Sequence, residues 1–354
     1  MIQFRRALPW LLAALLVAFV GWKLRTSHFD WAAFDRSWRT ADLRLIFLAF
    51  LVICTNYILR ALRWSIFLKP AYKLADKPPI AWWKLIGSQF IGFTGLAIFG
   101  RIGELIRPLL ISRRTGLNFS SQIAVVTVER VFDLGAFAIL FALNLLLSPN
   151  LQTLPYHQKF HAVGYAIAGL TLLVAVLILS IRLAGNAVAR ALAAILSRFS
   201  PRAGQATAEK VFAFRDGLNV IASLADFVAL AVISLVMWAS IAVSYVLVMK
   251  AFPPPVHNLT ISHTLVLMGF SVVGSIVQLP GVGGGAQVGT ISALTLLFNI
   301  PSELAISAGI IVWLVTTMSV IPVGLLYAKF EGISIRQVAN RSEDEEVAIL
   351  AGER

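Results

Sequence analysis

Charged residues are scarce in this sequence, and their scarcity excludes most soluble folds. Only 13% of the 354 residues are Asp, Glu, Lys or Arg, whereas 58% are hydrophobic. The mean hydropathy is +0.83, and a soluble domain needs more polar surface than this composition supplies. The sequence therefore predicts an all-α, polytopic membrane protein.

Cysteine and histidine are also rare, which argues against two kinds of site. The one cysteine, Cys54, has no partner for an intramolecular disulfide. Among the five histidines, His157 and His161 are four residues apart, but no third ligand is near them in the sequence. No nucleotide-binding loop or catalytic motif is found. We therefore expect no metal, no cofactor and no catalytic residue, and a non-enzymatic role is favoured.

The net charge of +13 does not indicate a nucleic-acid-binding protein, because the basic residues fall between apolar stretches. Cytoplasmic loops collect Lys and Arg in this way. The pattern predicts a multi-pass protein of the cytoplasmic (inner) membrane with both termini in the cytoplasm. The basic clusters on that side are expected at residues 5–6, 69–84, 113–114, 182–215 and 329–341.

The apolar pattern predicts one transmembrane domain over residues 1–330, with six to eight spans and a disordered cytoplasmic tail at 331–354. Arg60 and Arg63, near the end of the second span, are expected to snorkel to the cytoplasmic interface. An interfacial amphipathic helix is expected at 184–199. The full spans are expected at 8–22, 43–68, 120–147, 162–181, 224–249 and 302–327.

Two further apolar stretches are broken by glycine-rich turns and predict re-entrant hairpins. The apolar piece after the first turn has about ten residues, which rise about 15 Å, half of a bilayer core of roughly 30 Å. Non-helical backbone is tolerated at such depth only where protein or a wet cavity covers it. The turns are expected to contain Gly100 and Gly103 in the first hairpin and Pro280, Gly281, Gly283 and Gly284 in the second.

The two hairpins belong to an internal repeat in which residues 43–147 align with 224–328 at an offset of 180 to 181. Lys69 aligns with Lys250, and Ile102-Gly103 aligns with Val282-Gly283. One span separates the two units, so they would have opposite orientations in the membrane, with both hairpin tips near the midplane. Inverted repeats with broken helices are a transporter architecture.

Charged residues stand inside this apolar pattern, where they are costly unless a protein-lined site receives them. Two interpretations remain open: an ion network that locks the fourth span to the first hairpin, or a site for a lipid headgroup. In the second, arginines would hold a phosphodiester, and Glu129 and Asp133 would pair with a cationic headgroup or carry a proton. The candidate binding residues are Arg101, Glu104, Arg107, Glu129, Arg130 and Asp133.

Three motifs resemble one family. They are R-x-G-E-x-x-R-P at 101–108, V-x-x-E-R-V-F-D at 126–133 and L-P-G-x-G-G at 279–284. Together they are similar to the flippase-like, lysylphosphatidylglycerol-synthetase transmembrane-domain family. Its members include the membrane half of bacterial aminoacyl-phospholipid synthase/flippases. The resemblance covers roughly residues 10–330.

The sequence departs from this family at three points. Gly100 stands where proline is common, and Ala286 and Gln287 follow the second turn where an acidic residue is often found. The aminoacyl-transferase domain of the bifunctional members is missing, so the resemblance implies lipid translocation rather than synthesis.

The expected function is therefore flippase-like transport of a phospholipid or lipid-linked headgroup through a midplane polar site. The expected partners are membrane lipids, with an anionic phospholipid or a lipid-linked substrate favoured, and a separate synthase. An alternative is a membrane-embedded transferase acting on a lipid-linked substrate in envelope lipid or glycan assembly. A third option is a scaffold that transports nothing.

Overall fold

The computed structural model describes residues 29–152, 157–174, 221–276, 278–279, 283–335 and 337–338, with 176 and 194 singly. The side chains of residues 101–102, 278–279 and 283 are not among those described. The predicted first span, the amphipathic segment and nearly all of the acidic tail lie outside these ranges. So do Pro280 and Gly281 of the second turn.

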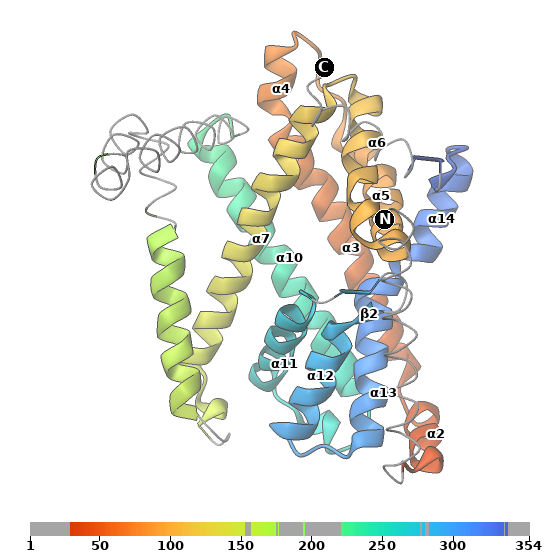
Figure 1. Cartoon of the computed structure of the whole chain (residues 1–354), viewed down its shortest axis with the longest axis vertical. Coiled ribbons are helices and arrows are strands. Elements are labelled where there is room, and N and C mark those ends of the chain that lie inside the picture. The colour runs from red at the N-terminus through yellow and green to blue at the C-terminus, as the bar shows by residue number, and fades with distance from the viewer. Residues whose placement is uncertain are drawn as a thin grey trace, which may run out of the picture.

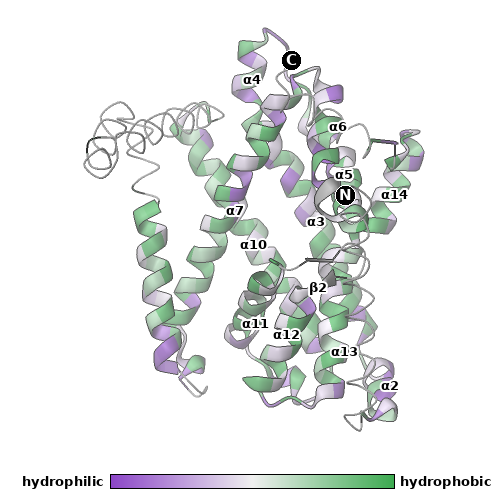
Figure 2. Cartoon of the chain, in the orientation of Figure 1, coloured by the Kyte–Doolittle hydropathy of each residue, from purple (hydrophilic) through white to green (hydrophobic). Residues whose placement is uncertain are grey.

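Within the described ranges, four helical stretches are long and apolar enough to cross a membrane, which confirms the polytopic class. The shortest has 28 residues, and such a helix is about 42 Å long, more than the roughly 30 Å hydrocarbon core. In Figure 2 the ribbons of these helices are coloured mostly as hydrophobic. The long elements are α3 (Leu43–Phe67) continuing into α4 (Lys69–Leu74), α7 (Phe119–Leu147), α10 (Leu224–Ala251), and α13 (Ser302–Trp313) continuing through η5 (Leu314–Met318) into α14 (Val320–Phe330).

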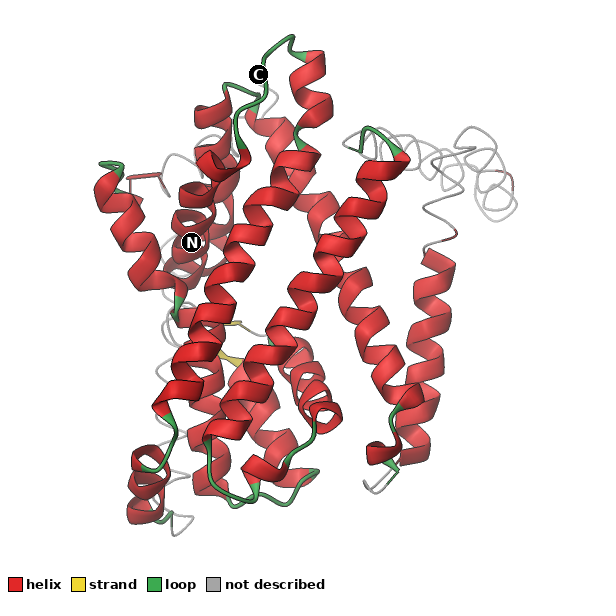
Figure 3. Cartoon of the chain, turned by 180° about the vertical axis from the view of Figure 1, so that it is seen from behind, coloured by secondary structure: helices red, strands yellow, loops and turns green. Residues whose placement is uncertain are grey.

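Two pairs of short helices stand between these long elements. The first pair is α5 (Ile86–Phe99) and α6 (Ile106–Thr115), joined by the 3-10 turn η2 (Gly100–Leu105). The second is α11 (Ile261–Gly274) and α12 (Gly285–Leu296), joined by the two-residue strands β1 (Gln278–Leu279) and β2 (Gly283–Gly284). In Figure 1, α5 and α6 lie in the upper half and α11 and α12 in the lower half. Figure 3 shows the same separation from behind, with the strands between the halves.

Both helical hairpins are closed by direct backbone contact at glycine. A Cβ on Gly103 would lie 2.0 Å from the Gly95 carbonyl oxygen, and a Cβ on Gly274 would lie 2.0 Å from the Gly285 carbonyl oxygen. No side chain fits at these distances, so glycine is required for each turn to fold back on its own helix.

Helices α3 and α10 cross in the centre of the molecule in antiparallel directions (Figure 1). Asn56 Nδ2 donates to the Met237 carbonyl oxygen at 2.8 Å, and Ser244 Oγ donates to the Ala49 carbonyl oxygen at 3.2 Å. Asn56 and Met237 are separated by 181 residues, within the offset of 180 to 181 expected for the internal repeat.

The structure adds two features that the sequence did not predict. A short helix, α2 (Trp31–Arg39), precedes α3. Asp30 caps it by accepting from two backbone N–H groups, and Ser37 bonds Ser307 of α13 at 2.5 Å. The last span, predicted as one continuous helix, is interrupted by the π-helical turn η5, where the Ser319 N–H donates to the Leu314 carbonyl oxygen at 2.9 Å. π-Turns often mark functional positions.

Candidate functional site

Two acidic residues of α7, Glu129 and Asp133, are the centre of a buried ion cluster. They are four residues apart and therefore lie on one face of the helix, one turn from each other. Glu129 is 1% exposed and Asp133 is 6% exposed. Carboxylates at such positions need cations and hydrogen-bond donors around them. The chain supplies three arginines, from two different elements.

Arg63 of α3 bridges the two carboxylates and is fully buried. Its Nη1 donates to Asp133 Oδ1 at 2.6 Å and to Ser234 Oγ of α10 at 2.8 Å. Its Nη2 donates to Glu129 Oε1 at 2.6 Å. The rigid fork of the guanidinium suits this double contact. Arg63 therefore joins three long helices, α3, α7 and α10, through one side chain.

Arg107 of α6 connects the first hairpin to the same acidic residue. Its Nη2 lies 2.5 Å from Glu129 Oε2, so each oxygen of Glu129 has an arginine partner. The Arg107 guanidinium also lies 4.4 Å from the Trp64 ring centroid and 4.8 Å from that of Phe93. Aromatic faces stabilise a cation that has left water.

Arg60 is the least tightly held member of the cluster. Its Nη1 lies 3.5 Å from Glu129 Oε1 and 3.6 Å from Asp133 Oδ2, so it forms ion pairs at longer range. Its side chain is 13% exposed, and its guanidinium lies 4.8 Å from the Phe93 ring centroid. Among the described residues, no side chain or backbone group makes a hydrogen bond with the Arg60 guanidinium. Arg60 thus keeps donors available for a further anion.

The ion cluster, defined as Arg60, Arg63, Arg107, Glu129 and Asp133, carries one positive charge in excess. Three guanidinium groups face two carboxylates. Because Arg63 and Arg107 make the short contacts with both acids, the excess charge lies at Arg60.

The other predicted binding residues lie apart from this cluster. Glu104 and Arg130 form their own ion pair, with side chains 32% and 50% exposed. Within the described part of the chain, no hydrogen bond or ion pair connects this pair to the cluster. The side chain of Arg101 is outside the described residues. Of the six candidates, Arg107, Glu129 and Asp133 are the ones brought together.

The prediction that Arg60 and Arg63 snorkel to the interface is wrong, because both turn inward to the carboxylates of α7. A signal was present in the sequence. The two arginines are three residues apart and the two acids, Glu129 and Asp133, are four residues apart, so each pair lies on one face of its helix. A cationic pair and an acidic pair within apolar spans are natural partners.

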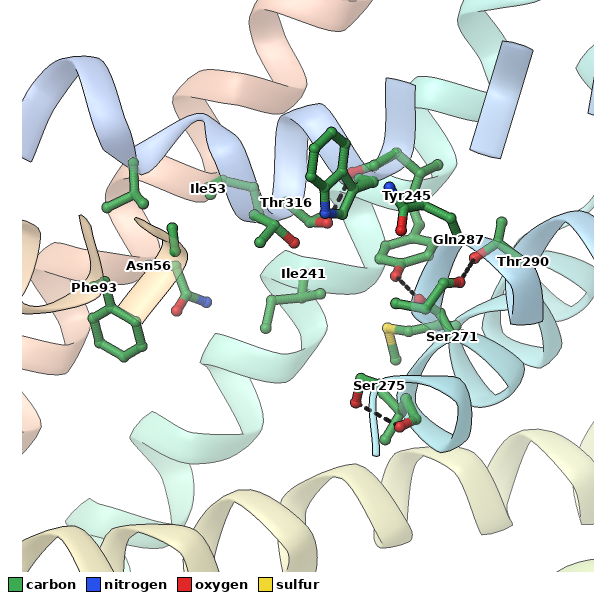
Figure 4. A pocket seen from close by; sticks show the side chains of 18 of the residues that line it. Ile53, Asn56, Phe93, Ile241, Tyr245, Ser271, Ser275, Gln287, Thr290 and Thr316 are labelled. Atoms are coloured by element: carbon green, nitrogen blue, oxygen red, sulfur yellow. Dashed lines mark hydrogen bonds between the residues drawn. The ribbon is translucent and has the colours of Figure 1, made fainter. Parts of the chain in front are cut away.

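A cavity of about 260 Å³ opens beside Arg60, between the two halves of the molecule. Its walls come from α3, α5, α10, α11, α12, α13, η5 and the first residue of α14. Figure 4 shows that side chains from these elements point into it from several sides. The polar or charged lining residues are Asn56, Tyr57, Arg60, Trp238, Tyr245, Ser271, Ser275, Gln287, Thr290, Trp313, Thr316 and Thr317.

The glycines of the predicted turns have two separate structural roles. Gly100 has φ +65° and Gly284 has φ +119°, backbone conformations that side chains disfavour. Proline fixes φ near −65°, so proline could not replace Gly100 in this turn. Gly103 permits the close approach to α5 described above. Gly284 ends the second turn where α12 begins, next to the lining residue Gln287.

Comparison with known proteins adds one match. Residues 9–324 match the family described as lysylphosphatidylglycerol synthase TM region. No curated protein and no solved structure is significantly similar to the chain.

Proposed function

Since the chain belongs to the lysylphosphatidylglycerol synthase transmembrane-region family, we propose that it moves a phospholipid or lipid-linked headgroup across the membrane. The observation that carries this proposal is the cavity at Arg60. It lies between the two hairpins and touches a cluster with one uncompensated positive charge. A transported headgroup needs a polar site within the protein, because a charge in the hydrocarbon core is costly.

The proposed transport mechanism is alternating access by an inverted repeat with two re-entrant hairpins. Three features support it: the antiparallel crossing of α3 and α10 at residues 181 apart, the glycine contact that closes each hairpin, and the placement of the hairpins in opposite halves (Figure 1). Inverted repeats of this kind hold substrate near the midplane between the repeats. Rocking of one unit against the other would open the cavity to each side in turn.

The cavity size suits a headgroup rather than a whole lipid. A volume of about 260 Å³ is near the lower limit of roughly 300 Å³ for pockets that hold drug-sized ligands. The acyl chains would therefore stay in the surrounding bilayer while the headgroup passes through the polar site.

Orientation in the inner membrane follows from charge in this proposal. The basic residues of α4 and of the C-terminal end of α6 lie at the same end of the molecule (Figure 1). We assign this end, and both termini, to the cytoplasm because cytoplasmic loops are enriched in Lys and Arg.

Reconstitution into vesicles tests the proposal. Purified protein in liposomes with a fluorescent phosphatidylglycerol should move the label between leaflets without nucleotide or activated donor. Ser275→Trp, which fills the exposed edge of the cavity, should slow this movement at least tenfold. The matched control is Ile276→Trp, because Ile276 is 83% exposed and does not line the cavity. Equal rates for the two variants would contradict the transport route. Chemical conversion of the lipid that requires an activated donor would instead indicate a transferase.

A further inference from the structure

We infer that the cavity selects a lipid with a single phosphodiester and a neutral, hydroxyl-bearing headgroup, and rejects an aminoacylated, cationic one. This inference rests on the proposed function and names the substrate class of the same site. It concerns the part of the cavity between Arg60 and the polar residues of α11 and α12.

The first argument is the charge of the lining. Among the described residues, Arg60 is the one charged side chain that lines the cavity. The nearest acids, Glu129 and Asp133, are already engaged by Arg63 and Arg107 at 2.5 to 2.6 Å. A lysyl or other cationic headgroup would have to break these buried pairs to gain a counter-ion. Like-charge contact with Arg60 would add to that penalty.

The second argument is the chemistry of the opposite wall. Hydroxyl and amide side chains from α11, α12 and η5 gather there, including Ser271, Ser275, Thr290 and Thr316 (Figure 4). Ser275, Thr290 and Thr316 each donate their hydroxyl proton to a backbone carbonyl four or three residues before them. Their oxygens therefore remain as acceptors, which suits the hydroxyl donors of a glycerol or sugar headgroup.

The third argument is the number of cations. The repeat offset of 181 places Ile241 at the position equivalent to Arg60, since 60 plus 181 is 241, and both residues line the cavity. The second repeat therefore contributes an apolar side chain where the first contributes a guanidinium. One excess charge matches one phosphodiester, whereas a diphosphate-linked lipid would bring a second anionic group without a cation.

Competitive lipid binding in detergent micelles tests this inference without requiring transport. Equimolar phosphatidylglycerol and lysyl-phosphatidylglycerol are added to the purified full chain, and the bound lipids are counted by native mass spectrometry. The unmodified protein should retain phosphatidylglycerol at least about tenfold more than the lysyl lipid. Arg60→Gln should abolish this preference. Arg60→Lys, which keeps the charge, should keep most of it.

Two more variants separate specificity from folding. Ser275→Asp places a carboxylate at an exposed edge of the cavity and should shift binding toward the lysyl lipid, even if Arg60→Gln does not fold. Arg130→Gln makes the same charge change as Arg60→Gln outside the ion cluster and should leave the preference intact.

The outcomes also separate this inference from the proposed function. Equal binding of both lipids by the unmodified protein, or a preference for the lysyl lipid, overturns the inference. Movement of both lipids in vesicles at one rate overturns it as well, although transport itself then stands. A clear preference for phosphatidylglycerol in micelles without movement in vesicles supports the inference and refutes transport.

Discussion

Replacing Arg63 with methionine is expected to be the most destabilising single change in the ion cluster. Methionine keeps the apolar stem but removes both 2.6 Å contacts, those with Asp133 and Glu129. Glu129 keeps Arg107 at 2.5 Å, but the nearest remaining cation to Asp133 is Arg60 at 3.6 Å. Breaking a buried pair in this way costs about 3–5 kcal/mol. The folded-to-unfolded ratio should therefore fall a hundredfold or more, since 1.4 kcal/mol is a factor of about ten.

The assay is reversible unfolding in mixed micelles with increasing denaturing detergent. The control is Arg130→Gln, because the Arg130 and Glu104 side chains are 50% and 32% exposed and solvent-exposed pairs contribute about 0–1 kcal/mol. A double variant, Arg63→Met with Asp133→Leu, removes both buried charges and should recover a large part of the lost stability. If Arg63→Met is no less stable than Arg130→Gln, the cluster is hydrated rather than buried, and the reasoning fails.

Three other predictions address the fold and the topology. Gly103→Ala should lower the yield of folded protein, because the new Cβ would lie 2.0 Å from a carbonyl oxygen of α5. The control Gly135→Ala should not lower the yield, because a Cβ there would have nothing within 4 Å. Equal yields of the two variants from membranes would contradict the close helix contact. Asn56→Leu should destabilise the crossing of α3 and α10 by about 0.5–2 kcal/mol, as lost interhelical hydrogen bonds in membranes do; an unchanged unfolding midpoint would show that the crossing depends on packing alone. In a cysteine-free background, Asn258→Cys should react with an impermeant thiol reagent in intact cells, whereas Lys73→Cys should react after lysis only. The reason is that Lys and Arg mark the cytoplasmic side. The reverse labelling pattern would show that the topology is inverted.

The sequence was sufficient for the positions of the long helices α3, α7 and α10 because the signals are local. Long apolar runs predicted a second span over 43–68, and α3 occupies Leu43–Phe67. The same holds for α7 and α10, whose predicted first residues differ from the observed ones by one residue or none. Glycine-rich turns marked both breaks between short helices, since glycine interrupts a helix whatever surrounds it. The motifs at 101–108 and 126–133 were sufficient to indicate the family that residues 9–324 match.

The sequence was not sufficient for features that depend on contacts between distant segments. The turn η5 interrupts a run, Leu314–Met318, that reads like the helix around it, because a π-turn depends on packing rather than on composition. Glu104 was predicted to share one site with Arg107 and Glu129, yet in the structure it lies in η2 and pairs with Arg130.

The ion cluster shows most clearly which contacts the sequence alone could not predict. An arginine near the end of a span can extend to the interface or turn inward, and its own sequence surroundings are the same in both cases. The partner that decides the matter for Arg63 is Glu129, which is 66 residues away on another helix. Only the packing of α3 against α7 and α10 places the two within 2.6 Å. Composition and periodicity therefore determined that charges would be buried in this membrane protein. Tertiary structure decided which charges pair with one another, and that Arg60 is the one left facing the cavity.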